Sequence, residues 1–223
     1  MSLRVAIQMD PLENVNIDGD TSFALAETAQ ARGMEIFVYQ PQDMSLEGRR
    51  VTAKARPAKV QRVKGTPGIF GEAVTLDLAK DVDVILMRQD PPFDMGYITT
   101  THILQRVHPD TLVVNDPFWV RNYPEKLMVL DFPELTPPTT IARDLETIKA
   151  FKAKHGDVIL KPLYGNGGAG VFKMHSADSN LASLHELFAG INREPLIMQK
   201  FLPDVSKGDK RVILVDGEPV GAI

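Results

Sequence analysis

The sequence contains no cysteine in its 223 residues. The chain therefore cannot form a disulfide bond, and none of its side chains can act as a thiolate nucleophile or metal ligand. A basic footprint is also missing, because the net charge is −4, and this disfavours binding to nucleic acid. No apolar run approaches the roughly 20 residues of a membrane-spanning helix. We therefore expect a cytoplasmic protein without a nucleic-acid or membrane partner, long enough for one large or two small domains.

Two signatures of phosphate-binding enzymes are missing as well. The chain has no G-x-x-x-x-G-K-[ST] sequence, so a P-loop is not supported. It also has no H-R-D or D-F-G sequence, so the protein-kinase arrangement is not supported either. A nucleotide site in this chain would have to be built from other residues.

The stretch 157–175 has the pattern of a strand, a glycine-rich loop and a second strand. Residues 158–160 are apolar and lead to Lys161, residues 165–170 read Gly-Asn-Gly-Gly-Ala-Gly, and residues 171–174 alternate as a strand does. A loop tip with so few side chains lets backbone N–H groups close on a phosphate, with Lys161 beside it. The loop also spells G-x-G-x-x-G, but an NAD site needs a helix after the loop, and a strand pattern follows here. A plain glycine-rich surface hairpin is the alternative.

The N-terminal part has the pattern of a parallel sheet. Residues 3–9 and 34–40 are apolar strand patterns, and between them a helix pattern begins at Asp20, with Asp20 or Thr21 as its N-cap. Such a strand–helix–strand unit predicts parallel strands, whose ligands bind beyond their C-terminal ends. Asp10 and the loop with Asn16 lie beyond the first strand, which makes them candidate substrate-binding residues. The alternative is that Asp10 only begins a turn.

A second predicted strand end carries Arg88. Residues 82–87 predict a buried strand, and Arg88 follows it directly. An arginine at this position can hold a substrate carboxylate in a bidentate grip. Pairing of Arg88 with Asp90 or Asp94 is the alternative.

The segment 44–64 alternates only weakly and is rich in Arg and Lys. It predicts a polar hairpin or edge strands whose cations form a solvated face, since charged side chains protect a sheet edge. Residues 65–71 predict a loop, residues 97–107 a helix, and residues 111–115 a fourth strand.

A second domain is predicted to begin with a helix near Asn122, with Pro124 in the first turn. Lys126 also lies in this first turn, where the helix dipole disfavours a cation, and this suggests contact with an anion. Further on we expect a linker at 133–138, a strand at 139–141, helices at 145–155 and 180–189, a strand at 196–201, and a hairpin turn at 216–217. The chain stops inside the second strand of that hairpin, so we expect that part of the natural protein is missing.

Five segments together resemble the prokaryotic glutathione synthetase family of ATP-grasp ligases. In chain order they are 9–17 (Met-Asp-Pro and later Asn-Ile), 84–94 (VILMRQDPPFD), 122–127 (NYPEKL), 159–168 (ILKPLYGNGG) and 208–219. The resemblance covers nearly the whole chain. It implies an α/β fold with an N-terminal parallel-sheet, Rossmann-like pre-ATP-grasp domain (1–122). An incomplete α+β ATP-grasp domain would follow, with a small lid subdomain (123–196) and the start of a second subdomain (197–223).

The resemblance also implies an activity, the ATP-dependent joining of γ-glutamylcysteine to glycine through an acyl phosphate. It assigns catalytic roles to Lys161 and Arg211, and substrate binding to Arg88, Asp10 and Asn16. It assigns ATP binding to Lys126, Lys161, Gly165, Asn166, Gly167, Gly168, Gln199, Lys200, Phe201, Leu202 and Asp209. The glycine-rich loop would act as a lid that keeps water from the acyl phosphate.

The same resemblance implies Mg²⁺, with Mn²⁺ as an alternative, and a homotetramer. The family's metal ligands follow the hairpin at 210–223, so we name no metal ligand in this chain and expect them downstream of Ile223. Two alternatives stay open at this point. One is another ATP-grasp carboxylate–amine ligase, and the other is a non-catalytic ATP-binding module.

Overall fold

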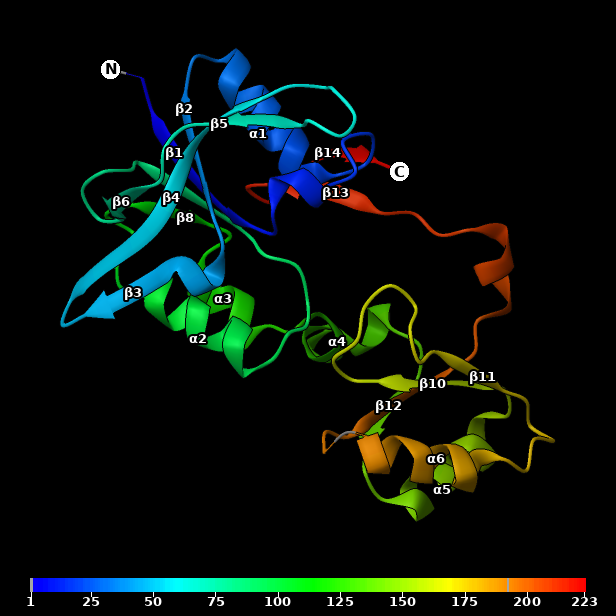
Figure 1. The fold of residues 1–223 in the computed structure, drawn as a ribbon. Helices are drawn as coiled ribbons and strands as arrows, with labels where there is room; N and C mark the ends of the chain where they lie inside the picture. The colour runs from blue at the N-terminus through cyan, green and yellow to red at the C-terminus, as the bar shows by residue number, and fades with distance from the viewer. Residues whose placement is uncertain (1, 192) are drawn as a thin grey trace. The chain divides into compact units, whose positions relative to one another are not determined.

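The computed structural model describes residues 2–191 and 193–223. These form two compact units, and the boundary between them along the chain falls between Pro124 and Glu125. Each unit has its own sheets (Figure 1). No helix in the described residues is long and apolar enough to cross a membrane.

The N-terminal unit is built on four parallel strands, as the strand–helix–strand pattern predicted. These are β1 (Arg4–Met9), β2 (Glu35–Tyr39), β7 (Val84–Arg88) and β8 (Leu112–Val114), in the spatial order β2-β1-β7-β8. The C-terminal ends of β1 and β7 lie side by side, because Met9 pairs with Arg88. The residues that follow these two strands therefore share one edge of the sheet.

Both faces of this sheet are covered, which explains the almost unbroken apolar sequence of its strands. Helix α1 (Thr21–Ala31) packs on the face that carries Ile7 and Met9, and the side chain of Asp20 accepts a hydrogen bond from the N–H of Phe23 as its N-cap. Helix α2 (Met95–Leu104) contributes Leu104 to the opposite core. The prediction of α1 and its cap is confirmed.

The segment 44–64 forms the hairpin that was predicted, with one strand at 44–47 and the other at 50–60, but only the first of these strands lies at the edge of the sheet. Strand β4 (Arg50–Val60) is not an edge strand, since it pairs antiparallel with β2, β3 (Met44–Glu47), β5 (Gly68–Phe70) and β6 (Val74–Asp77). Every second residue from Val51 to Ala55 is buried. Because Arg and Lys residues alternate with these small apolar residues, the sequence pattern did not indicate a central strand. The predicted loop at 65–71 likewise contains β5.

Helix α3 (Pro117–Asn122) was not predicted, although Asp116 caps it and Pro117 begins it. Helix α4 (Glu125–Met128) then opens the second unit, one residue after Pro124, and contains the predicted Lys126. Short 3₁₀ turns complete the connections: η1 (Leu12–Asn14), η2 (Pro41–Asp43), η3 (Val129–Asp131), η4 (Pro133–Leu135) and η5 (Pro203–Lys207).

The second unit contains a four-stranded antiparallel sheet in the order β11-β10-β12-β9. Its strands are β9 (Thr139–Ala142), β10 (Val158–Pro162), β11 (Phe172–Met174) and β12 (Leu196–Lys200). Helices α5 (Leu145–His155) and α6 (Leu181–Ile191) pack on one face, around Val158, Leu160 and Met198. Strands β13 (Val212–Val215) and β14 (Glu218–Ala222) form the predicted hairpin with its turn at 216–217.

Candidate functional site

Two lysines lie at the base of the glycine-rich loop of the second unit. The Nζ atom of Lys126 donates to the carbonyl oxygens of Pro162 at 3.1 Å and Gly165 at 2.6 Å. Helix α4 supplies this lysine, and β10 supplies Lys161 one residue before Pro162. The structure thus brings together both predicted lysines and the first residue of the loop.

The pKa values of both lysines are lowered. Partial burial lowers the pKa of Lys126, Glu125 partly opposes this, and the neighbouring charge of Lys161 lowers it further. Burial also lowers the pKa of Lys161. Two neighbouring ammonium groups that are partly buried favour binding of a polyanion. A triphosphate reduces the repulsion between the two charges and replaces the water that burial has removed from them.

A pH dependence follows from these lowered pKa values. Bound phosphates favour the charged lysines, so ATP affinity should be constant at neutral pH and should fall on the alkaline side, beginning below the ordinary lysine pKa of 10.5. In that range ATP binding should take up protons. Titration calorimetry in two buffers of different ionisation enthalpy, at pH 7 and pH 9.5, measures this uptake. If ATP binding takes up no protons at either pH, the assignment of these two lysines to the phosphates of ATP is contradicted.

The side chains of Lys161 and Gln199 lie on the sheet face opposite α5 and α6. Leu160 and Met198 are paired across β10 and β12 and belong to the helix-covered core, so their sequence neighbours Lys161 and Gln199 point the other way. Gln199 donates to Thr139 Oγ at 3.0 Å. Lys200, the last residue of β12, is exposed, and Phe201 has the ammonium of Lys173 3.8 Å from its ring centroid.

The loop from Gly165 to Gly170 is an irregular hairpin tip. Within it the N–H of Ala169 donates to Asn166 O, and Asn166, Gly167 and Gly168 are exposed. Gly170 has φ +71°, and a Cβ there would lie 3.0 Å from the ring of Pro162. Strand β11 follows the loop, and no helix begins at it, so the NAD-site interpretation of G-x-G-x-x-G is excluded.

Asp209 and Arg211 belong to the exposed segment that leads into the β13–β14 hairpin. The backbone of Arg211 exchanges two hydrogen bonds with Ile223, and its side chain is exposed. Leu202 precedes the short turn η5 and is 52% exposed. Within the described residues, neither Asp209 nor Arg211 hydrogen-bonds to Lys126 or Lys161, so their assigned roles stay predictions.

In the N-terminal unit, Arg88 lies at the edge where the parallel strands end. Its Nε donates to Ser22 Oγ at 3.1 Å, and Ser22 lies in the first turn of α1 and is buried. The predicted alternative, pairing with Asp90 or Asp94, is not formed, and Asp94 instead caps α2. Sequence reasoning missed Ser22, although its position beside the N-cap Asp20 was a usable signal.

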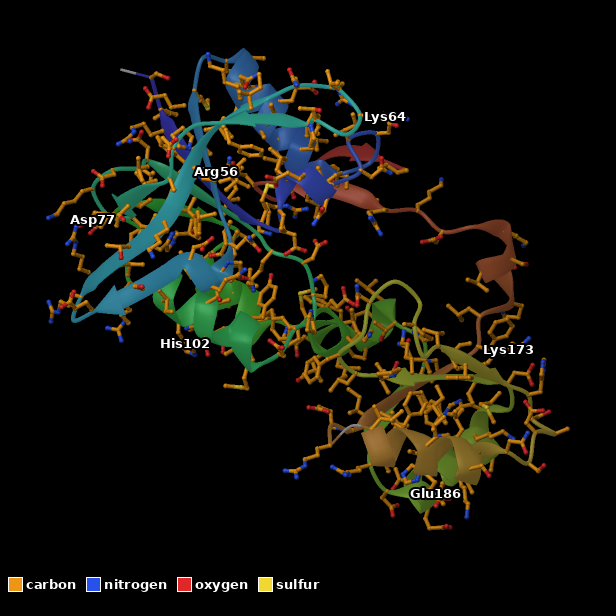
Figure 2. The ribbon with its side chains drawn as sticks, viewed as in Figure 1. Arg56, Lys64, Asp77, His102, Lys173 and Glu186 are labelled. Atoms are coloured by element: carbon orange, nitrogen blue, oxygen red, sulfur yellow. The ribbon has the colours of Figure 1, made fainter. Side chains whose placement is uncertain are left out.

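Asp10 lines a cavity of about 460 Å³ at the C-terminal ends of β1 and β2. Lys54 and Arg56 of β4 line the same cavity, and the position of Arg56 is labelled in Figure 2. The guanidinium of Arg56 lies 4.2 Å from the centroid of the Phe70 ring. These cations were predicted to form a solvated face, and the pairing of β4 with β2 is what brings them beside Asp10.

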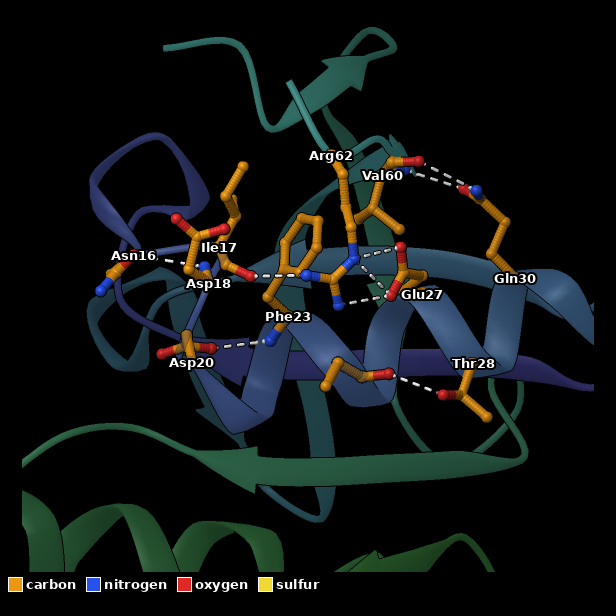
Figure 3. A network of polar contacts seen from close by, with 11 residues as sticks. Asn16, Ile17, Asp18, Asp20, Phe23, Glu27, Thr28, Gln30, Val60 and Arg62 are labelled. Atoms are coloured by element: carbon orange, nitrogen blue, oxygen red, sulfur yellow. Dashed lines mark hydrogen bonds and ion pairs between the residues drawn. The ribbon is translucent and has the colours of Figure 1, made fainter. Parts of the chain in front are cut away.

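Asn16 lies in the loop between β1 and α1, and its side chain stabilises this loop by accepting from the N–H of Asp18. Arg62, on the segment after β4, clamps the same loop (Figure 3). One guanidinium nitrogen donates to Ile17 O at 3.0 Å, while Nε and the other nitrogen hold the carboxylate of Glu27 on α1. Arg62 is therefore a positioning residue that no motif in the sequence indicated.

The Arg62–Glu27 pair should make the stability of the N-terminal unit depend on pH. The hydrogen bond from Arg62 lowers the pKa of Glu27 in the folded chain. The stabilisation is therefore fully present above the ordinary glutamate pKa of 4.5 and is lost as pH falls through the lowered value. Glu27→Gln should lower the urea midpoint at pH 7 by more than it lowers the midpoint at pH 3. Trp119, the single tryptophan, reports this unit by fluorescence, with Glu47→Gln as the exposed control.

Metal ligation is not provided by the described residues. They contain no group of three or more His, Cys, Asp or Glu side chains arranged to hold a metal ion. The second unit offers two lysines and a backbone loop to an anion, and the N-terminal unit separately offers Arg88 to a carboxylate.

Solved structures with a similar fold indicate the class of protein. The structure resembles the RimK-domain ATP-grasp protein of Sphaerobacter thermophilus, with a TM-score of 0.65, 20% identity, and coverage of 98% of this chain and 71% of that one. An antiparallel sheet with a glycine-rich hairpin and two lysines, following a parallel-sheet unit, is the ATP-grasp fold.

Sequence comparison then gives the family. The model of the prokaryotic glutathione synthetase N-terminal domain matches residues 3–121, and that of its ATP-grasp domain matches residues 125–223. The glutathione synthetases of Mesorhizobium japonicum and Brucella melitensis biotype 1 are each 56% identical to this chain, over 100% of its length and 71% of theirs. The chain belongs to the prokaryotic glutathione synthetase family of ATP-dependent ligases.

Proposed function

We propose that this chain carries the ATP-binding and dipeptide-binding residues for the ligation of γ-glutamylcysteine to glycine. The products are glutathione, ADP and phosphate. The observation that carries the proposal is the pair Lys126 and Lys161 at the base of the glycine-rich loop, in a chain of this family. The alternatives of a different carboxylate–amine ligase or a non-catalytic ATP-binding module have no comparable support.

The chemistry consists of two substitutions. A carboxylate oxygen of the cysteine residue attacks the γ-phosphorus of ATP, and the bond to ADP breaks. The glycine amine then attacks the acyl carbon, an amide bond forms, and phosphate leaves with the former carboxylate oxygen. Because phosphoryl transfer needs charge neutralisation more than covalent help, the protein contributes mainly cations and positioning.

The described residues divide this work between the two units. In the second unit, Lys126 and Lys161 would neutralise ATP phosphates, and the loop Gly165–Gly170 would exclude water from the acyl phosphate. In this structure the ammonium of Lys126 donates to two carbonyl oxygens, and its third N–H can donate to a phosphate. In the N-terminal unit, Arg88 would bind a carboxylate of the dipeptide.

Three further properties are proposed from the family alone. ATP would bind together with Mg²⁺, but the described residues do not fit a metal ion, so no step is assigned to it. The protein would be cytoplasmic and homotetrameric. Light scattering on the natural protein tests the last point, with the mass of four chains as the expected result and the mass of one chain as the contrary one.

Substrate-dependent release of ADP tests the proposed function. We expect release only when γ-glutamylcysteine and glycine are both present, and a product with the mass of glutathione. The same assay with D-alanine or with glutamate in place of this pair tests for the other ATP-grasp ligases. No turnover of the first pair by the full-length protein, while ATP still binds, would favour a non-catalytic ATP-binding module.

A further inference from the structure

The cavity beside Asp10 has the size and position of a ligand site. Its volume is about 460 Å³, within the range of about 300–1,000 Å³ that small-molecule sites occupy. It lies where β1 and β2 end, which is the end of a parallel sheet at which ligands bind. Part of its lining is apolar, namely Met9, Leu12, Val38 and Phe70. Those side chains can pack against methylene groups.

The charged lining of this cavity contains both signs. Asp10 and Glu13 come from the end of β1, and Lys54 and Arg56 come from β4. Among the described residues, Arg56 and Glu13 form a single long contact of 3.5 Å, and neither Asp10 nor Lys54 forms an ion pair. Opposite charges around one cavity that do not neutralise each other suit a ligand that carries both an ammonium and a carboxylate group.

The fifth charged residue of the lining is already engaged. Asp43 accepts a hydrogen bond from the N–H of Gln40 at 2.9 Å and closes the cap of η2. Arg56 is held in place by its stacking on Phe70, so its guanidinium loses little freedom when it binds a carboxylate. The groups available to a ligand are therefore Asp10 for a cation, and Lys54 and Arg56 for an anion.

We infer that this cavity binds the glutamyl head group of the dipeptide substrate, an inference that rests on the proposed function. Asp10 receives the α-ammonium group, while Lys54 and Arg56 receive the α-carboxylate. γ-Glutamylcysteine carries this zwitterion at the end remote from the carboxylate that ATP activates. Two methylene groups follow it, which match the apolar part of the lining. Glycine is also a zwitterion, but its five heavy atoms leave most of the cavity empty.

The test compares γ-glutamylcysteine with two analogues, each lacking one charge. Glutarylcysteine lacks the α-ammonium group, and 4-aminobutanoylcysteine lacks the α-carboxylate. For the unmodified protein, each analogue should lower kcat/KM for ADP release about ten- to hundredfold, the usual effect of one lost charged hydrogen bond. Substitution of the matching side chain should remove that discrimination.

Each variant therefore has its own insensitive analogue. Asp10→Asn should lower kcat/KM for γ-glutamylcysteine about ten- to hundredfold and leave that for glutarylcysteine unchanged. Lys54→Met and Arg56→Met should lower kcat/KM for γ-glutamylcysteine by a similar factor and leave kcat/KM for 4-aminobutanoylcysteine unchanged. The KM values for ATP and glycine should not change. Lys59→Met, an exposed lysine of the same strand outside the cavity lining, is the control and should match the unmodified protein.

Two results would overturn the inference while leaving the proposed function intact. One is an equal loss for all three dipeptides in every variant, and the other is a rise in the KM for glycine. If the unmodified protein releases no ADP with γ-glutamylcysteine and glycine, the proposed function fails. Calorimetric titration of the three dipeptides into the same variants then still decides whether the cavity binds the zwitterion.

Discussion

Replacing Lys161 by methionine should reduce kcat/KM for ATP by at least about a hundredfold, the effect of losing one preorganised group that stabilises transferred charge. Lys161 points from β10 to the sheet face that α5 and α6 leave uncovered, and its ammonium is already partly dehydrated. Methionine keeps most of the length of the unbranched side chain and removes the ammonium group. Calorimetry with ATP should show weakened binding, and ADP release should fall in parallel.

A matched control for this variant is Lys154→Met. Lys154 is an exposed cation of α5 in the same unit, so its loss changes the net charge equally. We expect ATP binding to Lys154→Met to equal that of the unmodified protein. Unchanged ATP affinity in Lys161→Met, with the fold intact by circular dichroism, would remove this lysine from the nucleotide site.

Replacing Gly167 by valine should slow ligation strongly and leave the N-terminal unit folded. Gly167 has φ +61°, a conformation that costs an L-residue about 1–2 kcal/mol, and more when the side chain is β-branched. A Cβ at this position meets no atom within 4 Å, so the effect would come from backbone strain in the loop and not from a clash. The strained loop should populate its closed form less and let water reach the acyl phosphate.

Gly48→Val separates loop function from strain as such. Gly48, between β3 and β4 in the N-terminal unit, has φ +60° and also has no atom within 4 Å of an added Cβ. The same substitution at the same backbone angle should cost stability there, visible in Trp119 fluorescence, while ligation per folded molecule stays normal. Equal ligation rates in the two variants would reduce the loop Gly165–Gly170 to a surface turn.

Local patterns were sufficient to predict the elements that depend on nearby residues. The strand–helix–strand unit β1–α1–β2, the helix predicted at 145–155 (α5) and the glycine-rich hairpin of β10 and β11 are all confirmed. In each case the signal, an apolar period or a capping side chain, lies within about ten residues. Lys126 was singled out from its place in the sequence, and the structure puts its ammonium beside the glycine-rich loop, whereas its contact with an anion stays a prediction.

Contacts between distant segments could not be read from local patterns. Strand β4 pairs with four other strands, and only this pairing moves Lys54 and Arg56 from an expected solvated face to a cavity beside Asp10. The clamp of Arg62 on Ile17 and Glu27 joins residues 35 to 45 positions apart. The sequence does not distinguish an arginine or lysine that contacts a distant segment from one that does not. The pairing of the strands determines which charged side chains lie close together.

Transfer of oxygen from substrate to phosphate tests the central claim most directly. If γ-glutamylcysteine is labelled with ¹⁸O in both oxygens of its cysteine carboxylate, ligation through an acyl phosphate must place one labelled oxygen in the released phosphate and keep the other in the new amide. Mass spectrometry of phosphate and glutathione from one reaction measures both. We predict one ¹⁸O in each phosphate for every glutathione formed, whereas unlabelled phosphate alongside glutathione would contradict the account.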